Sequence, residues 1–251
     1  MLMRRDVEFS IIIPAKNEAL NIAQLLSEIR SACGDRNNYE VIVVNDGSDD
    51  DTITRLREAA KTGLTQLRVL DNARSVGQST SIYRAAWVAR GQWLVTLDGD
   101  GQNDPADIPG MLAKIQDPAA QSQNIKLVAG HRVIRRDTWI KRWSSKFANG
   151  LRRRLLKDDT PDTGCGLKVI ERTLFLQLPY FDHMHRFIPA LVKRHGGALL
   201  THPVNHRPRA EGRSNYGTLD RALVGILDLF GVWWLIRRTR LEVSPCELEL
   251  K

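Results

Sequence analysis

The sequence predicts an α/β protein whose mostly parallel sheet is flanked by helices. Three observations predict it. Short β-branched runs alternate with segments of helical apolar spacing. Polar or acidic clusters directly follow several of the predicted strands. A length of 251 residues with 42% hydrophobic residues is enough for one sizeable core. Charged residues make up 26% and prolines number only 10, which excludes a disordered or collagen-like chain.

The N-terminal half contains the repeated strand and helix pattern. Residues 9–14 and 39–44 are short β-branched runs, and residues 17–32 between them carry apolar side chains at helical spacing. The pattern continues with a helix over 50–60, a strand over 66–70, a helix over 80–89 and a strand over 93–97. Strands that alternate with helices favour a parallel sheet covered on both faces.

The cysteines and histidines show no pattern of a structural metal site. Cys33, Cys165 and Cys246 are far apart and lack CxxC spacing, so neither a disulfide framework nor a zinc site is expected. Cys165 lies between two glycines and reads as a small buried residue. The following histidines lack zinc-ligand spacing and are expected to be polar or structural: His183, His185, His195, His202 and His206.

Basic charge is concentrated in one segment of the chain. The net charge is +8, yet residues 131–157 hold ten Lys and Arg against the single acid Asp137, a local charge of +9 that leaves the rest at −1. Apolar residues recur there at three- and four-residue spacing from Ile134 to Leu156, which predicts an amphipathic helix with a basic face. Such a segment indicates an anionic partner: nucleic acid, a membrane surface or a phosphorylated substrate.

The longest apolar stretch covers residues 222–236. These 15 positions span roughly 22 Å as a helix, less than the ~30 Å hydrocarbon core of a bilayer. Trp233, Trp234 and flanking arginines are typical of a helix in the membrane interface. A buried C-terminal core helix with a solvated end explains the composition equally well. The N-terminal apolar run stops at Lys16, too short for a signal peptide, so a cytoplasmic protein is expected.

Two acidic clusters follow predicted strands, where open parallel sheets bind ligands. Residues 98–102 read DGDGQ and offer two carboxylates and an amide oxygen, which suits Mg²⁺ or Mn²⁺, although Asp-Gly is also a common turn. In residues 45–51, Ser48 and Asp49–Asp51 are explained as structural residues at a helix start. Asp46 precedes the turn and could accept hydrogen bonds from a nucleobase or ribose. The sequence contains neither a P-loop nor a dinucleotide-binding signature.

The ordered series PAKNE, NDGSDD, LDGDGQNDP, AGHR, DTGCGLK, HRFIPAL and HRPRAEGRSNYG resembles the family-2 glycosyltransferases of GT-A fold. Within them it is similar to the dolichyl-phosphate mannose synthase branch, the polyprenyl-phosphate glycosyltransferases. The resemblance covers residues 9 to 238. It implies a metal-dependent, inverting hexosyltransferase that moves a sugar from a GDP-mannose-like or UDP-hexose-like nucleotide sugar to polyprenyl or dolichyl monophosphate.

The resemblance also implies roles for individual residues. The donor's nucleoside would be lined by Pro14, Ala15, Asn17, Glu18, Asp46 and Gln78. Asp98 and Gly99 would contact donor ribose and phosphate, and the metal would be held by Asp100, Gln102 and Asp98. The acceptor phosphate would be received by Arg132, Lys141, Arg142, Ser145 and Arg209, with a register ambiguity of one residue at 141–145. Asp98, Asp100 and Arg132 would be the catalytic residues.

The chain departs from the family pattern at two places. Many relatives have two adjacent aspartates where this chain has Asn45 and Asp46. Several bacterial relatives carry two or more spanning helices after the catalytic domain, whereas this chain shows one short amphipathic candidate. We therefore expect a GT-A catalytic domain over 1–217 and an amphipathic membrane-surface helix and tail over 218–251. The protein would be peripheral at the cytoplasmic face of the membrane.

The chemistry explains the charges. A divalent ion stabilises a departing diphosphate, and an ionised phosphate acceptor needs no general base. Arginines would bring the two polyanions together, and one in-line displacement would invert the anomeric centre. An alternative is a sugar or glycan hydroxyl acceptor with Asp162 as general base. A nucleic-acid module would use Trp139, Trp143 and Phe147 for stacking, but their helical spacing favours a core role, so no nucleic-acid partner is expected.

Overall fold

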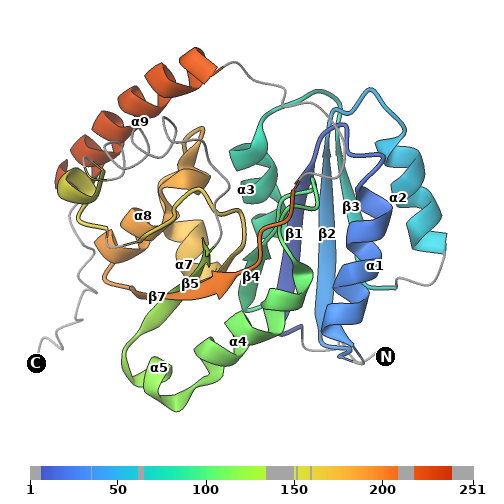
Figure 1. The fold of residues 1–251 in the computed structure, drawn as a ribbon, viewed down its shortest axis with the longest axis horizontal. Helices are drawn as coiled ribbons and strands as arrows, with labels where there is room; N and C mark the ends of the chain where they lie inside the picture. The colour runs from blue at the N-terminus through green and yellow to red at the C-terminus, as the bar shows by residue number, and fades with distance from the viewer. Residues whose placement is uncertain are drawn as a thin grey trace, which may run out of the picture.

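The computed structural model describes residues 7–34, 36–61, 65–133, 150, 152–158, 160–208 and 218–238. Within them a seven-stranded sheet has the order β3-β2-β1-β4-β6-β5-β7 (Figure 1). The strands are β1 (Phe9–Ala15), β2 (Tyr39–Asp46), β3 (Leu67–Asn72), β4 (Trp93–Thr96), β5 (Ile125–Arg132), β6 (Lys168–Glu171) and β7 (Ala198–Val204).

The sheet is mostly parallel, which confirms the prediction. β1 pairs in parallel with β2 and β4, β2 with β3, and β5 with β7. Only β6 runs in the opposite direction among these strands, antiparallel to both β4 and β5. Its first residue, Lys168, lies opposite Thr96 near the end of β4. The segment that enters β6 therefore reaches the same edge at which the parallel strands end.

Helices cover both faces of this sheet (Figure 1). They are α1 (Ile22–Cys33), α2 (Thr52–Lys61), α3 (Gln78–Val88), η1 (Pro105–Asp107), α4 (Ile108–Gln116), α5 (Pro118–Ser122), α7 (Arg172–Gln177), η2 (Met184–Arg186), α8 (Ile188–Arg194) and α9 (Thr218–Arg238). Apolar side chains of α1, α2 and α4 form one core cluster with the sheet. Those of α3, α7, α8 and α9 form a second cluster on the other face.

The central strands form because both of their faces are apolar. In β1, Ile11 and Ile13 join the first cluster, and Ile12 between them joins the second. All three side chains are fully buried. Alternate side chains point to opposite faces of a strand, so a continuous β-branched run is suited to a strand covered on both sides.

The observed elements differ from the predicted ones mainly at their boundaries. The first helix was expected from residue 17 but begins at Ile22. Asn17 has a φ of +58°, in the left-handed region, which is incompatible with a right-handed helix. In the basic segment, residues 131 and 132 belong to β5 and residues 152–156 are helical. The rest of that predicted amphipathic helix, residues 134–149, lies outside the described residues.

The C-terminal helix α9 combines the two alternatives that the sequence left open. Leu229 and Val232 are buried in the second core cluster. Leu227, Phe230 and Trp234 lie on the opposite side and are 72%, 51% and 56% exposed. The helix is thus docked on the domain by one side while large apolar side chains face outward on the other. No helix among the described residues combines the length and the hydropathy that are needed to cross a bilayer.

Candidate active site

The candidate site lies at the edge where the parallel strands end. Pro14 and Ala15 end β1, Asp46 ends β2, and Arg132 ends β5. The 98–102 loop follows β4, which pairs with β1. A Cβ built on Gly99 would lie 3.0 Å from the carbonyl oxygen of Pro14, so this loop touches the end of β1. The fold thus brings residues predicted for the donor, the metal and the acceptor to one edge.

The loops after β1 and β2 are joined to each other by hydrogen bonds. The backbone N–H of Asn17 donates to Ser48 Oγ at 3.0 Å, and that of Asp49 donates to Asn17 Oδ1 at 3.0 Å. Asparagine tolerates the left-handed conformation observed here better than most residues. Glu18 is buried and accepts from Asn21 Nδ2 at 2.7 Å. The predicted donor residues Asn17 and Glu18 are therefore part of a fixed loop pair.

Asp50 shows why part of the second acidic cluster is structural. Its Oδ1 accepts from the backbone N–H of Thr52, the first residue of α2, at 2.9 Å. Its Oδ2 accepts from the backbone N–H of Ala19 in the neighbouring loop at 3.1 Å. Burial favours the protonated form, but these hydrogen bonds outweigh it and hold the pKa of Asp50 below its ordinary value. The structural role predicted from the helix start is confirmed for Asp50.

Asp46 is a buried carboxylate that fixes the loop in front of α3. It accepts four hydrogen bonds, from Asn72 Nδ2 and the backbone of Val76 and Gly77 at 2.9 Å, and from Ser75 Oγ at 2.8 Å. Burial would raise its pKa, but the hydrogen bonds lower it below the usual range. A carboxylate has about four lone-pair sites. The four hydrogen bonds from the protein itself therefore use these sites. The predicted contact of Asp46 with the donor's nucleoside stays a prediction.

Asp98 is held at the centre of the edge. Gln78, the first residue of α3, donates from Nε2 to Asp98 Oδ1 at 2.8 Å, so two predicted site residues meet. A Cβ on Gly166 would lie 2.1 Å from Asp98 Oδ2, which leaves no room for any side chain there. Thr96 Oγ1 donates to the Gly166 carbonyl at 2.6 Å and keeps that backbone against β4. The position of Asp98 is therefore set by contacts with two other segments, α3 and the chain that leads into β6.

The pKa of Asp98 is set by its burial and by the charges around it. Burial, and next the negative charge of Asp100, raise the pKa of Asp98 to about 6. The cations Lys168 and Arg132 and the hydrogen bond from Gln78 oppose this increase. The charge of Asp100 thus disfavours the ionised form of Asp98, and a cation bound beside Asp98 would favour it.

The donor set fits a divalent cation that keeps open positions. Asp100 Oδ1 accepts from the backbone N–H of Gln102 at 3.1 Å, which fixes the turn that carries both residues. Within the described ranges, no cluster of three or more His, Cys, Asp or Glu side chains is found. Two carboxylates and an amide oxygen match the way Mg²⁺ is bound beside substrate phosphates, with few protein ligands. The residues Asp98, Asp100 and Gln102 therefore fit the predicted metal.

Arg132 is held by a buried carboxylate. Its Nε donates to Asp162 Oδ2 at 2.6 Å and its Nη2 to Asp162 Oδ1 at 2.8 Å, a bidentate pair. Asp162 is 2% exposed. The pair fixes the plane of the guanidinium at the end of β5. Asp162 is thus engaged by a cation at both oxygens, an arrangement that does not favour the general base considered above.

Four of the predicted acceptor residues lie outside the described residues: Lys141, Arg142, Ser145 and Arg209. The prediction that Cys165 is a small buried residue is confirmed. Cys33 and Cys165 are free and buried. Burial raises the pKa of both thiols, to about 11 for Cys33. Cys246 lies outside the described residues.

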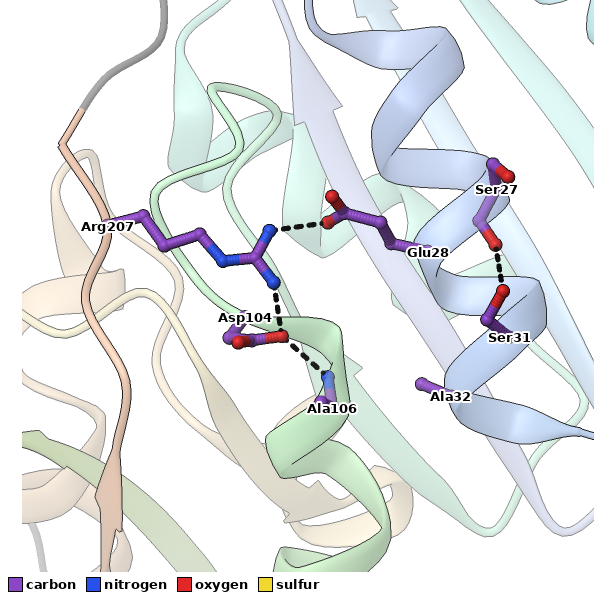
Figure 2. Close-up of a pocket in the computed structure, with 7 residues that line it drawn as sticks. All are labelled: Ser27, Glu28, Ser31, Ala32, Asp104, Ala106 and Arg207. Atoms are coloured by element: carbon purple, nitrogen blue, oxygen red, sulfur yellow. Dashed lines mark hydrogen bonds and ion pairs between the residues drawn. The ribbon is translucent and has the colours of Figure 1, made fainter.

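Arg207 is a structural residue of this edge that sequence reasoning missed. Its backbone N–H donates to the Gln102 carbonyl at 2.9 Å. Its guanidinium contacts Glu28 at 2.7 Å and Asp104 at 2.6 Å, bridging α1 and the turn after β4 beside a cavity of about 350 Å³ (Figure 2). Both carboxylates are paired with it, so Arg207 ties the turn after β4 to α1. The available signal was the HRPR motif, of which only Arg209 was predicted as a site residue.

Lys168 and His185 are buried polar groups that were also missed. Lys168 is 3% exposed, donates to the Cys165 carbonyl, and has a pKa lowered by burial. A lysine inside the apolar run LKVI was a usable signal, because lysine is almost never fully buried without a partner. His185 Nδ1 lies 2.8 Å from Ser79 Oγ, and burial lowers its pKa to about 3. This contact joins η2 to α3 and confirms a structural role for His185.

The comparison with protein families identifies one domain. Residues 10–178 match the model of "Glycosyl transferase family 2". The matched region contains the described residues predicted for the donor, the metal and the acceptor phosphate, from Pro14 to Arg132, and also Asp162.

Curated relatives share about a third of the sequence. The chain is 32% identical over 242 residues, 93% of its length, to a dodecaprenyl-phosphate galacturonate synthase of Rhizobium johnstonii. It is also 32% identical, over 86% of its length, to an undecaprenyl-phosphate 4-deoxy-4-formamido-L-arabinose transferase of Edwardsiella ictaluri. The chain spans 68% and 65% of the lengths of these two proteins.

Solved structures share the fold at low sequence identity. Glucosyl-3-phosphoglycerate synthase from Mycobacterium tuberculosis, in complex with UDP, is similar with a TM-score of 0.67 and 19% identity, covering 95% of this chain and 82% of that chain. The same enzyme with Mn²⁺, UDP and glucosyl-3-phosphoglycerate gives a TM-score of 0.66 at 20% identity, with the same coverage. The likeness confirms the predicted GT-A architecture.

Proposed function

The chain belongs to glycosyl transferase family 2, and from this premise we propose that it transfers a sugar from a nucleotide sugar to polyprenyl monophosphate. The proposal rests on one observation: an acidic group of side chains and a fixed arginine lie at the same edge of the sheet. The acidic pair Asp98 and Asp100 suits a metal-bound diphosphate, and Arg132, oriented by Asp162, suits a second phosphate. The polyprenyl-phosphate sugar transferases among the relatives support the same acceptor.

The donor's nucleoside would lie against the joined loops after β1 and β2. Pro14, Ala15, Asn17 and Glu18 form one wall by this proposal, and the loop that Asp46 holds forms another. Because the hydrogen bonds already exist without a ligand, little ordering is required on binding. Gln78 and Gly99 lie beside Asp98, where the ribose and the phosphates would follow.

Metal binding would involve Asp98, Asp100 and the amide oxygen of Gln102. Mg²⁺ or Mn²⁺ bound there would supply Lewis-acid stabilisation of the departing nucleoside diphosphate. The protein's own contribution is to fix these oxygens. Gln78 and Gly166 hold Asp98 in place, and the backbone of Gln102 holds Asp100.

Arg132 would bind the acceptor phosphate and turn one of its oxygens toward the sugar. A planar guanidinium binds phosphate in a directed way, and its bidentate pair with Asp162 fixes that direction. Lys141, Arg142, Ser145 and Arg209 remain proposed further contacts to the phosphates. Cations are needed because a monophosphate approaching a diphosphate is repelled.

The reaction is a single displacement. A phosphate oxygen of the acceptor forms a bond to the anomeric carbon while the bond from that carbon to the diphosphate oxygen breaks with its electron pair. The acceptor oxygen is already ionised at neutral pH, so no proton has to be removed. An α-linked donor would therefore give a β-linked polyprenyl-phosphate sugar.

The donor belongs to the nucleotide sugars, with GDP-mannose-like and UDP-hexose-like donors both proposed. The relatives named for galacturonate and for 4-deoxy-4-formamido-L-arabinose add acidic and amino sugars to the set to be tested. A dolichyl-phosphate mannose synthase activity is one member of this set.

Membrane attachment would occur through α9. A lipid acceptor stays in the bilayer, so the enzyme has to meet it at the surface. The outward side chains Leu227, Phe230 and Trp234 supply the apolar face, and Arg237 and Arg238 end the helix with positive charge. We propose a peripheral protein at the cytoplasmic face.

A transfer assay tests the proposal. Purified protein is incubated with a short polyprenyl phosphate and a panel of nucleotide sugars, with Mg²⁺, with Mn²⁺ or with chelator. One donor is expected to give a glycolipid of inverted configuration only when metal is present. A product that forms only with a glycan acceptor would contradict the proposal, as would retention of configuration.

A further inference from the structure

A pocket lies away from the candidate site, between the helical segment 152–156 and the C-terminal half of α9. Its volume is about 600 Å³. Arg154, Lys157 and Arg237 supply three cations at its walls, and the remaining lining is apolar, including Leu155 and Trp233. This volume falls within the range of roughly 300 to 1,000 Å³ that is typical of small-ligand pockets.

The charge of this pocket is unbalanced. No acidic side chain is among its described lining residues. The nearest carboxylate in sequence, Asp158, is fully buried and pairs with Arg152 at 3.2 Å. Arg237 lies over the ring of Trp233, 4.4 Å from its centre, which holds the guanidinium at the pocket wall. A positively charged, partly apolar pocket is complementary to an anion that carries an apolar tail.

Both sides of the pocket are anchored to the same helix, α8. Lys193 Nζ donates to the Lys157 carbonyl at 2.9 Å. Arg194 Nε donates to the Ile236 carbonyl at 2.6 Å. Consecutive residues of α8 therefore fix the end of the segment 152–156 and the end of α9 relative to each other. The pocket is a formed feature of the fold.

The pocket adjoins the outward apolar face of α9. Leu227, Phe230 and Trp234 recur at spacings of three and four residues and so lie on one side of the helix. Arg237 is three residues beyond Trp234 and continues this side toward the pocket. If that face enters the interfacial region of a bilayer, the pocket cations come to the depth of the phosphate groups.

We propose that this pocket binds the phosphate headgroup of an anionic bilayer phospholipid, with the apolar wall against the start of its acyl chains. The proposal rests on the membrane attachment proposed above. The site is distinct from that of the acceptor phosphate. Arg132 ends β5, whereas the pocket is lined by residues 154–157 and by α9. Figure 1 shows α9 on the outside of the domain, away from β1 and β2. The bound phospholipid would orient the domain on the surface without reacting.

Vesicle binding by the full chain tests this inference. The double variant Arg154→Gln/Arg237→Gln removes two pocket cations. The control Arg153→Gln/Arg238→Gln removes the same charge from exposed neighbours on the same two helices that do not line the pocket. Binding is measured by co-sedimentation with phosphatidylcholine vesicles, with and without phosphatidylglycerol. No polyprenyl phosphate is present.

The pocket variant is expected to lose at least about tenfold more affinity for phosphatidylglycerol vesicles than the control, because phosphate contacts are lost in addition to surface attraction. Equal losses in the two variants would overturn the proposal that the pocket binds phospholipid and would leave the proposed membrane attachment intact. A wild-type protein that binds neither vesicle would overturn the attachment itself.

Two further arms separate the sources of phosphate. Inorganic phosphate at millimolar concentration is expected to leave vesicle binding unchanged, since it has no apolar tail. Polyprenyl phosphate added to phosphatidylcholine vesicles is expected to restore little of the binding that phosphatidylglycerol gives. The phospholipid assignment is wrong if inorganic phosphate releases the wild-type protein from phosphatidylglycerol vesicles. It is also wrong if polyprenyl phosphate replaces phosphatidylglycerol for the wild-type protein but not for the pocket variant.

Discussion

The two halves of the candidate site are built by different means. On the side of β1, β2 and α3, carboxylates and hydroxyls accept backbone N–H groups and join the loops into one unit. Asp46 and Asp50 are the main examples. On the side of β5, the guanidinium of Arg132 is held by the buried carboxylate of Asp162, which fixes its plane at the end of the strand.

The difference follows from what each half would bind. A nucleoside is recognised by shape and by directed hydrogen bonds, so its pocket gains from loops that are rigid before binding. A lipid phosphate is a charged headgroup on a flexible tail and is attracted mainly by positive charge. Asp98 and Asp100 lie where the two halves meet, which is where a bond would be formed.

The largest effect is expected at this junction. Asp100→Asn keeps the shape of the turn but removes one of the two negative charges that suit the metal. Turnover in the transfer assay should fall by about 10² to 10³, the usual loss for one electrostatic stabiliser. Asp51→Asn, an exposed carboxylate at the same edge, is the matched control and should retain wild-type turnover. Equal losses in the two variants would remove Asp100 from the junction.

A smaller effect, a loss of stability, is expected when hydrogen bonds are removed from the side of β1, β2 and α3. Asp46→Asn removes charge-assisted bonds to Ser75, Val76 and Gly77 and should cost about 3 kcal/mol in the free energy of unfolding, measured by urea denaturation. Because the folded-state pKa of Asp46 is lowered, its contribution is present above the unfolded pKa of about 3.9 and is lost as the pH falls toward the folded value. A variant as stable as wild type at pH 7 would contradict this role.

A further loss of stability is expected in acid at His185, which connects η2 to α3 through Ser79. Its folded pKa of about 3 lies below the unfolded value of 6.5, so the unfolded chain binds the extra proton first. Stability should therefore decrease below pH 6.5, by at most about 1.4 kcal/mol per pH unit. The His185→Gln variant should show a flatter decrease between pH 6.5 and 5 in thermal unfolding. If stability decreases as steeply in the variant as in wild type, other titrating groups cause the decrease.

The smallest effect is expected at the attachment of α9. His183 Nδ1 lies 3.1 Å from Asp228 Oδ2 and links the helix to the loop before η2. Asp228→Asn should destabilise the protein by no more than about 1 kcal/mol, because the pair is partly exposed to solvent. Hydrogen exchange should become faster in α9 and stay unchanged in β1 and β2. Faster exchange throughout the sheet would show that α9 is integral to the core.

The sequence was sufficient for the elements whose pattern is local. β1, β2 and β4 are apolar runs with two buried faces, and their positions were predicted within a few residues. The reversed direction of β6 was not predictable, because its four residues carry no signal of direction. The start of α1 was missed because Asn17 is held by Ser48 and Asp49, a contact between loops that are distant in sequence.

The site was predictable as a set of residues but not as a set of contacts. The acidic turn of Asp98 and Asp100 is visible in the sequence, and its meeting with Gln78 depended on the family resemblance. The bidentate pair of Arg132 and Asp162 joins residues 30 positions apart. Pattern and spacing do not show which cation a buried carboxylate will bind, because that is decided by how strands pair.

The division into two halves is tested most directly by initial rates over a matrix of donor and acceptor concentrations. The variants compared are Arg132→Lys, which keeps the charge but loses the directed pair, and Asp46→Asn. Arg132→Lys is expected to raise the KM for polyprenyl phosphate about tenfold and to leave the KM for the nucleotide sugar within about twofold, since a lysine cannot replace a bidentate arginine. Asp46→Asn should raise the KM for the nucleotide sugar about tenfold and leave the KM for polyprenyl phosphate within about twofold. If both variants raise the KM of the same substrate, the two halves do not exist as described.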